Sequence, residues 1–321
     1  MAVDLQLCRG SLINNYFALD RFNDVKSVID SAYAHKLDSA GLHESGYMVE
    51  FVRGDAAGMQ REAAWAIGKT QEVFILVMQA DTEAYNGRMR KAREIWQRSI
   101  DAALRNDNKE IAASAKLDEA SFESGFGNIS RARRLVTEAL ALSSGREAVE
   151  VAAQVLAEAG DAVAAEKLVT TLKHDFPKDT IIQRSYLPAV QAQIELSKGN
   201  AGNAIDLLEQ TRPLELGIGL YSIYVRGMAY LRANQPQAAS TEFQKIINHR
   251  GVTLNSRSAP LARVGLARAA ASQSENTEGA EADAARVRAL LAYKDFFTLW
   301  KDSDPDIPIL QQAKAEYAKL Q

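Results

Sequence analysis

The sequence contains few of the residues that disulfide-bonded, metal-binding or membrane-spanning proteins require. Among 321 residues there is one cysteine, Cys8, which excludes an internal disulfide and argues against a thiolate metal site. No stretch reaches about 18 consecutive apolar residues, and no basic segment followed by an apolar one opens the chain, so we expect neither a membrane span nor a signal peptide. The net charge of only -3 argues against a dedicated nucleic-acid-binding surface.

The residues that are present favour a folded, helical protein. Hydrophobic residues make up 47% of the chain and charged residues 25%, which is enough for a substantial core. Prolines number 7 and aromatic residues amount to 7%, whereas alanine is abundant. This balance predicts a soluble chain built from helices.

One stretch, Leu220 to Thr253, has the spacing of a known helical repeat. Gly227 and Tyr230 stand in its first half, Ala239 and Phe243 in its second, and the pair Asn234-Gln235 separates the halves. A glycine, an aromatic, a small residue and a second aromatic at these offsets are typical of the tetratricopeptide repeat (TPR), a helix-turn-helix of about 34 residues. The small residues let helix A and helix B of the hairpin approach, and the aromatics fill the space beside them.

Similar breaker pairs recur along the chain at intervals of 33 to 40 residues, at 20–21, 54–55, 87–88, 127–128, 160–161, 199–200, 234–235 and 274–275. Such a period predicts an all-α, right-handed TPR superhelix (α-solenoid) of about eight helical hairpins, forming a single domain over residues 1–321. We expect the repeats at 6–39, 40–72, 73–112, 113–145, 146–184, 185–219, 220–259 and 260–306, and a C-terminal capping helix at 308–320.

Helix B of each repeat should present one small residue to helix A and, four residues later, one apolar packing residue. The first position holds Val25, Met59, Ala92, Ala132, Ala165, Ala204 and Ala239. The second holds Ile29, Ala63, Trp96, Val136, Val169, Leu208 and Phe243. Because both positions recur at the same offsets in seven repeats, they support this alignment of the repeats with one another.

The C-terminal end departs from this pattern. An expanded segment between Ser274 and Leu290 predicts a last helix B that begins after Gly279. The capping helix should start at Pro308 and turn Lys314, Glu316 and Lys319 outward, because the terminal unit of a solenoid needs a polar outer face.

No segment carries a complete catalytic, metal-binding or cofactor motif, so no catalytic residue, metal ligand or cofactor is predicted. Asp302, Asp304 and Asp306 have the spacing that opens a calcium loop, but Ile307 and Ala313 stand where its glycine and glutamate belong, which leaves a helix-capping turn. His249-Arg250-Gly251 begins like a kinase catalytic loop and lacks its aspartate, so Gly251 is expected to end helix B in a left-handed conformation.

The predicted functional surface is the concave groove lined by the A helices, where this class of repeat usually binds peptides or helices. In the first helix of each repeat, the residue one position after the place that Gly227 occupies in the template is polar in most repeats and differs in type from one repeat to the next. Tyrosines lie on the same predicted face of these helices, where they either anchor a ligand or pack between repeats. The candidate groove residues are Asp81, Tyr85, Gln154, Tyr186, Gln193, Tyr221, Tyr224, Met228 and Arg268. Basic clusters at residues 88–98 and 131–134 are either solvated faces or sites for an anionic partner.

Three segments resemble a particular family. QADTEAYNGRMRKAREIWQRSIDAAL (79–104), YVRGMAYLRANQPQAASTEFQKIINHRGVTLNS (224–256) and YKDFFTLWKDSDPDIPILQQAKAEYAKLQ (293–321) look like the C-terminal TPR region of bacterial serine/threonine protein kinases. Related chains carry a winged-helix transcriptional regulator instead of the kinase. The resemblance implies a sensing, docking or oligomerising region of a signalling protein, although residues 274–290 depart from the pattern and no effector domain is present. No kinase catalytic residue can be transferred to this chain.

Two hypotheses about function follow. The first is a non-catalytic scaffold or sensor module that binds a protein or peptide in the concave groove and can self-associate, without binding nucleic acid. The second is a regulatory domain that senses a small molecule in that groove. The compartment stays open, cytoplasmic for a standalone chain and extracytoplasmic for one attached behind a membrane-spanning kinase.

Overall fold

The computed structural model describes the backbone of residues 2–321 and the side chains of residues 9–217 and 219–321, so the environment of the Cys8 side chain lies outside the described residues. Over residues 2–321 the chain forms nineteen α-helices and one π-helical turn, with no strand. No helix in this range is long and apolar enough to cross a membrane.

Eight antiparallel helix pairs follow one another along the chain, each with its two helices in contact. The pairs are α1 (Ala2–Ala18) and α2 (Phe22–Ala34), α3 (Ala40–Arg53) and α4 (Ala56–Trp65), α5 (Glu72–Tyr85) and α6 (Met89–Arg105), α7 (Lys109–Gly125) and α8 (Ile129–Leu142), α9 (Arg146–Glu158) and α10 (Ala162–Asp175), α11 (Leu187–Ser197) and α12 (Ala201–Glu209), α14 (Tyr221–Arg232) and α15 (Pro236–Asn248), and α17 (Ser258–Glu275) and α18 (Gly279–Leu299).

The remaining elements are short or terminal: the π-helical turn η1 (Ile182–Tyr186), the helices α13 (Glu215–Ile218) and α16 (Arg250–Thr253), and the final helix α19 (Pro308–Leu320). The predicted fold class, an all-α solenoid of TPR-type hairpins with a C-terminal helix, is confirmed. The division into one domain with the stated repeat limits stays a prediction.

The turns inside the hairpins depend on residues that tolerate a left-handed backbone. The first residue of seven predicted breaker pairs has φ between 55° and 96°, and each is glycine, asparagine or aspartate. The eighth pair is misplaced, because α17 continues through Ser274 to Glu275 and the turn falls at residues 276–278. The last helix B does begin at Gly279, as expected.

Small residues bring the paired helices together. Ala92, Ala132, Ala165, Ala204 and Ala239 are all fully buried where helix B crosses helix A. A Cβ atom on Gly227 would lie 2.7 Å from the ring of Phe243, so only glycine leaves room for that ring. The packing position expected four residues after each alanine is buried throughout, from Trp96 to Phe243.

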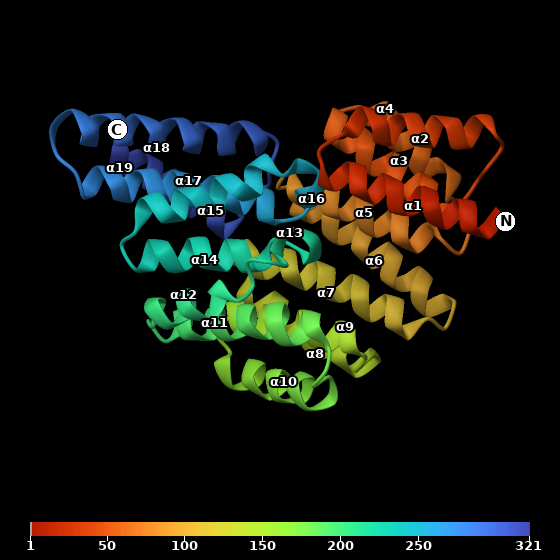
Figure 1. Cartoon of the computed structure of the whole chain (residues 1–321), viewed down its shortest axis with the longest axis horizontal. Coiled ribbons are helices and arrows are strands. Elements are labelled where there is room, and N and C mark those ends of the chain that lie inside the picture. The colour runs from red at the N-terminus through yellow and green to blue at the C-terminus, as the bar shows by residue number, and fades with distance from the viewer. Residues whose placement is uncertain (1) are drawn as a thin grey trace.

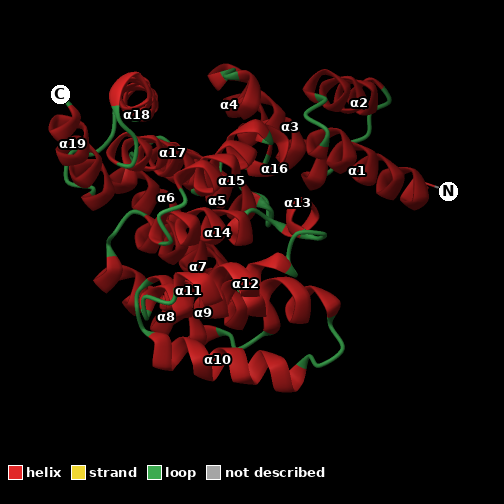
Figure 2. Ribbon diagram, turned by 60° about the vertical axis from the view of Figure 1, so that its left-hand side comes forward, coloured by secondary structure: helices red, strands yellow, loops and turns green. Residues whose placement is uncertain are grey.

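The stack curls back on itself, so that α16, between the seventh and eighth pairs, lies against α1 of the first pair, as Figure 1 and Figure 2 show. The segment from His249 to Ser258, here called the connector, runs across the concave side and joins distant hairpins. Arg250 donates to the carbonyl of Val52 at 2.6 Å, and the N–H of Gly251 donates to Asp20 at 2.6 Å. The result is a closed arrangement rather than an open superhelix.

The prediction for Gly251 is wrong. Gly251 lies within the short helix α16 and does not have a positive φ. Its glycine is needed because a Cβ atom would lie 1.8 Å from the carbonyl oxygen of Phe17, at the end of α1. Close contact with another helix, rather than a helix stop, explains the residue.

A second closure involves residues 300–309, here called the C-terminal arm. The indole N–H of Trp300 donates to the carbonyl of Tyr85 at 2.9 Å, and the N–H of Ile309 donates to that of Phe126 at 3.1 Å. Cβ atoms on Gly87 and Gly127 would lie 2.6 Å and 2.9 Å from side chains of the arm. The arm therefore packs on the turns of the third and fourth hairpins.

The acidic side chains of Asp304, Asp306 and Glu316 make contacts that the sequence did not predict. Glu316 was predicted to face outward, but it accepts hydrogen bonds from Arg268 at 3.0 Å and from Tyr293 at 2.7 Å. Asp304 and Asp306 both face Arg90, at 3.8 Å and 3.1 Å, and Asp304 also accepts from the backbone N–H of Arg90. The alternating aspartates thus anchor the arm to the start of α6.

Candidate functional site

Two hollows lie on the concave side, separated by the connector. Thr253 and Leu254 of the connector line both of them. The first hollow, here called the basic groove, has a volume of about 710 Å³ and lies between helices α3–α6 on one side and α15–α17 on the other. The second, here called the inner cavity, has a volume of about 430 Å³ and lies against successive A helices from α5 to α14.

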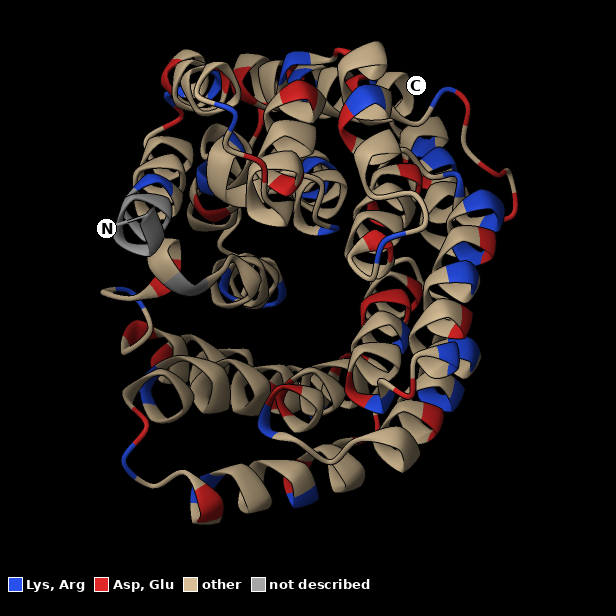
Figure 3. Cartoon of the chain, turned by 90° about the vertical axis from the view of Figure 1, so that its right-hand side faces the viewer, with Lys and Arg blue, Asp and Glu red and all other residues tan. Residues whose placement is uncertain are grey.

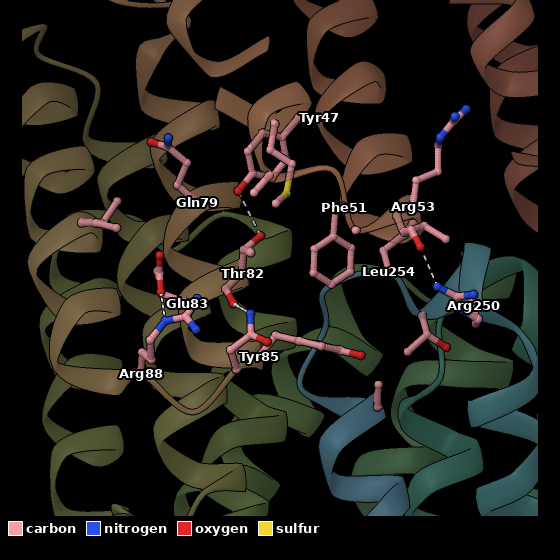
Figure 4. Close-up of a pocket in the computed structure, with 18 of the residues that line it drawn as sticks. Tyr47, Phe51, Arg53, Gln79, Thr82, Glu83, Tyr85, Arg88, Arg250 and Leu254 are labelled. Atoms are coloured by element: carbon pink, nitrogen blue, oxygen red, sulfur yellow. Dashed lines mark hydrogen bonds and ion pairs between the residues drawn. The ribbon is translucent and has the colours of Figure 1, made fainter. Parts of the chain in front are cut away.

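The basic groove carries an excess of positive charge, and Figure 4 shows its labelled residues. Its acidic lining residue is Glu83, against six basic residues, which are Arg53, Arg88, Lys91, Arg98, Arg250 and Arg263. Lys91 lies 2.8 Å from Glu83, and Arg88 also bonds to it. Although burial acts to raise it, these hydrogen bonds hold the pKa of Glu83 below its ordinary value.

Several of the basic groups keep unused hydrogen-bonding capacity. Arg98 is exposed and has no ion-pair partner among the residues whose side chains are described. Arg53 reaches its nearest carboxylate, Glu50, only at 3.7 Å. Aromatic side chains lie beside these cations, with Phe51 and Tyr85 packed edge to face at 5.1 Å between ring centroids. The groove thus combines free cations with apolar surface.

The charged residues elsewhere are mixed in sign. Figure 3 shows Lys and Arg interspersed with Asp and Glu around the closed arrangement of helices. Several members of the basic clusters predicted on α6 and α8 are paired; for example, Arg93 donates to Glu123 at 2.6 Å and Arg131 to Glu119 at 2.7 Å. The basic groove is therefore a local concentration of charge rather than one end of a basic face.

The inner cavity is lined by side chains from five successive A-helix positions and by the connector. Asp81 comes from α5, Asp118 from α7, Gln154 from α9, Tyr186 from η1 and Tyr221 from α14. This placement agrees with the expectation that A helices line the concave side of a TPR stack. Residues from Val252 to Ser258 form the opposite wall.

Two carboxyl groups in the inner cavity have pKa values above the ordinary value for aspartate. Burial raises the pKa of Asp118 to about 7. Burial also raises the pKa of Asp81, and the neighbouring Asp118 charge raises it further, although a 3.1 Å hydrogen bond from Trp96 acts in the opposite direction. At neutral pH the pair therefore retains protons that ordinary aspartates would have lost.

Two hydroxyl groups at this cavity have no hydrogen-bond partner. The hydroxyl oxygens of Tyr221 and Ser256 are inaccessible to solvent, yet neither is bonded to any described residue. The nearby Arg257 is already engaged, because its two terminal nitrogens lie 2.7 Å and 2.9 Å from the carboxylate oxygens of Glu158. Buried hydroxyls are normally satisfied, so these two are unusual.

The structure does not bring all the predicted groove residues together. Asp81, Gln154, Tyr186 and Tyr221 come together in the inner cavity, whereas Tyr85 lines the basic groove. Tyr224 and Met228 pack into the hydrophobic core, with Tyr224 6.0 Å from Phe243. Arg268 is bound to Glu316, and Gln193 is partly buried and lines neither hollow. Ligand binding by any of these residues stays a prediction.

Sequence reasoning missed the connector and Asp118. Asp118 lies three residues before Ser121 on α7, and both line the inner cavity, so a shared helix face was the available signal. The connector residues carry no comparable signal, because their partners are about 100 to 230 residues away, as for Arg257 and Gly251.

A separate cluster surrounds His43 on α3. Its ring nitrogens lie 2.7 Å from Glu62 and 2.8 Å from Asp38, and the ring stacks on Trp65 at 4.3 Å. Within the described residues, no three His, Cys, Asp or Glu side chains converge as they would around a metal ion. The cluster ties α3 to α4 through ordinary hydrogen bonds.

No family model matches the chain, and no curated protein matches it either. Among solved structures, the crystal structure of yeast Tom70 matches with a TM-score of 0.45 and 14% identity, over 94% of this chain and 59% of that one. The crystal structure of the P58(IPK) TPR domain matches with a TM-score of 0.28 and 13% identity, over 100% and 99% of the two chains.

This chain thus spans less than two thirds of the yeast Tom70 chain. The fold assignment rests on the eight helix pairs and on the small residues at their crossings.

Proposed function

We propose that this chain is a non-catalytic TPR-type scaffold that binds a protein or peptide partner in the basic groove. The observation that carries the proposal is the excess of basic side chains, six against one acidic residue, around a groove of about 710 Å³. A partner segment with acidic side chains would match this charge, and electrostatic complementarity favours fast and specific association.

The groove supplies both kinds of contact that an extended peptide needs. Arg53 and Arg98 are exposed and offer guanidinium donors that fit carboxylates. Phe51 and Tyr85 offer aromatic surface for an apolar residue of the partner. An acidic peptide with one or two large apolar side chains is the ligand class that suits this lining.

The test is a fluorescence-anisotropy titration with a labelled peptide of alternating Asp, Glu and Leu residues. Lys91→Glu combined with Arg98→Glu should weaken binding at least about tenfold, since charge reversal replaces attraction by repulsion. Lys173→Glu combined with Arg286→Glu makes the same change in net charge at exposed positions outside the groove and should leave binding unchanged. Equal losses in both double variants, or no binding by the unmodified chain, would refute the proposal.

The signalling context is a further part of the proposal. The three segments that resemble the TPR region of bacterial serine/threonine kinases suggest a kinase or a winged-helix regulator as the attached or related effector. The coding sequence around this chain tests this directly: an in-frame kinase or winged-helix domain supports it, and an unrelated flanking protein contradicts it. Reproducible turnover by the purified chain would contradict its non-catalytic character, and sedimentation would show whether it self-associates.

A second candidate function is small-molecule sensing. The inner cavity favours it, because a hollow of about 430 Å³ brings together carboxyl, amide and aromatic side chains from successive A helices. A thermal-shift screen of metabolites tests this function, since a ligand that binds only the folded chain raises the melting temperature.

A further inference from the structure

We propose that the basic groove binds a phosphorylated segment of a partner protein, and that arginine side chains of the groove contact its phosphoryl group. The proposal deepens the peptide-binding function of the same groove and rests on it. It follows from three features of the groove: the positive charge without an acidic partner, the way in which backbone carbonyls hold two of the arginines, and the apolar surface beside them.

Much of the positive charge that lines the basic groove has no acidic partner. Glu83 is the acidic residue of the lining, and it already pairs with two of the six basic residues. Arg98, Arg250 and Arg263 form no ion pair with any residue whose side chain is described. Three guanidinium groups around one hollow are therefore left for an anionic ligand.

Backbone carbonyls hold two of these guanidinium groups in place. Arg250 donates one N–H to the carbonyl of Val52 at 2.6 Å, and its guanidinium lies 5.9 Å from the centre of the Phe22 ring. Arg263 donates one N–H to the carbonyl of Ala259 at 3.1 Å. Because a guanidinium has several N–H donors, each group keeps donors free after making its bond. Arginines held in this way lose less side-chain freedom when they bind an anion.

Charge and donor geometry favour a phosphoryl group over a carboxylate. A phosphoserine carries a charge of about -1.5 to -2 at pH 7 and three acceptor oxygens, whereas a carboxylate carries one charge and two oxygens. A hollow of about 710 Å³ admits only a short stretch of an extended chain. One phosphoryl group would supply nearly the charge of two carboxylates from a single position of that stretch. The planar fork of arginine also fits pairs of phosphate oxygens.

The apolar part of the lining indicates a segment of protein rather than a free anion. Phe51 and Tyr85 lie at the groove, and Ile246 and Leu254 belong to its wall, as the labels of Figure 4 show for three of the four. Inorganic phosphate would leave this surface exposed, whereas side chains beside a phosphorylated residue would cover it. A nucleic acid would extend past the groove over surface of mixed charge, which Figure 3 shows.

The experiment compares three versions of the labelled acidic peptide, with serine, glutamate or phosphoserine at the central position, by fluorescence anisotropy with the full chain. The phosphoserine version should bind at least about tenfold more tightly than the glutamate version, because it adds charge and acceptor oxygens. Inorganic phosphate and a single-stranded DNA oligonucleotide of equal charge should displace the phosphopeptide much less effectively than its own unlabelled form does.

A charge-conserving variant tests the role of the arginines. Arg98→Lys combined with Arg263→Lys keeps the net charge and removes two guanidinium forks, so it should lower the preference for phosphoserine over glutamate at least about threefold. Arg286→Lys, at an exposed position outside the groove, should leave the preference unchanged. The preference is a ratio measured on one protein, and partial unfolding would lower both affinities without changing that ratio.

The outcomes separate this inference from the function on which it rests. Equal binding of the phosphoserine and glutamate versions, or an unchanged preference in the lysine double variant, would overturn the inference and leave acidic-peptide binding intact. Inorganic phosphate or the oligonucleotide displacing the phosphopeptide as well as its own unlabelled form would overturn the assignment to a protein segment. If no version of the peptide binds, the inference and the peptide-binding function both fail.

Discussion

Phe243 shows at the scale of single residues how closely the hairpins pack. Its ring lies between two glycines, and Cβ atoms on Gly227 and Gly265 would lie 2.7 Å and 2.6 Å from it. Ala239, on the same helix, is fully buried at the crossing with α14. A position with so little free volume has no room for a larger side chain.

Ala239→Leu should therefore overpack the crossing and lower the free energy of unfolding by about 1 to 3 kcal/mol. Gln237 on the same helix is exposed, so Gln237→Leu should change it by less than about 0.5 kcal/mol. Urea unfolding of both variants provides the measurement. Equal effects would contradict the assigned packing face of α15.

Asp118 gives the stability of the fold an unusual dependence on pH. Its pKa is raised in the folded chain to about 7, so between about pH 4 and pH 7 the folded state binds a proton that the unfolded state has lost. Stability contributed by this group is present at low pH and is lost as pH rises through the folded pKa.

Asp118→Asn removes this dependence. We expect the difference in free energy of unfolding, variant minus unmodified chain, to increase by about 1 to 3 kcal/mol from pH 5 to pH 7.5. Denaturant unfolding at both pH values measures it, with Asp283→Asn as the exposed control. A difference in free energy of unfolding that stays constant with pH would mean that the pKa of the Asp118 carboxyl is not raised in the folded chain.

At the scale of elements, the connector decides where the concave side is open. It holds Arg257 against Glu158 and places the amide of Asn255 3.0 Å from the carbonyl of Met78. Leu254, with φ of 44°, turns the chain sharply between α16 and α17. The segment thereby forms the wall that the basic groove and the inner cavity share.

Gly251→Ala should dislodge the connector, because the new Cβ atom would lie 1.8 Å from the carbonyl of Phe17. We expect a loss of about 1 to 3 kcal/mol in unfolding free energy and faster hydrogen exchange in residues 249–258. Gly202→Ala, at an exposed helical glycine with open space around it, should instead be neutral or stabilising by up to about 1 kcal/mol. Unchanged exchange in Gly251→Ala would mean that the Phe17 contact does not hold the connector.

The elements that sequence reasoning placed correctly are those with local signals. A left-handed residue such as Gly54 or Asn234 marks a turn, and alanines at fixed offsets mark a crossing, so both can be recognised within one repeat. Gly251 was misread because a glycine allows either a positive φ or a close contact, and only the fold distinguishes them. Asp304 and Glu316 were misread because their partners, Arg90 and Arg268, lie outside their own repeat.

At the scale of the whole molecule, the two closures distinguish this chain from an open solenoid, in which each repeat contacts only its neighbours. The connector joins the seventh hairpin region to the first, second, third and fifth hairpins, and the C-terminal arm joins the eighth to the third and fourth. Contacts of this kind couple the stabilities of the two ends.

The chain should therefore unfold in one transition. Urea titration followed by far-UV circular dichroism and by tryptophan fluorescence should give the same midpoint, because Trp65 reports on the second hairpin and Trp300 on the C-terminal arm. Two separated midpoints would show that the N-terminal and C-terminal hairpins unfold independently.

The hydrogen bond between Asp20 and Gly251 also bears on how the chain folds in time. It joins positions 231 residues apart, whereas the contacts within a hairpin join positions one repeat apart or less. Because the entropy of loop closure grows only with the logarithm of loop length, this longer loop costs only about 2 kcal/mol more than a single repeat. Local hairpins should form first, and the Asp20–Gly251 contact should form late, in a step whose rate Gly251→Ala changes without slowing the formation of helix.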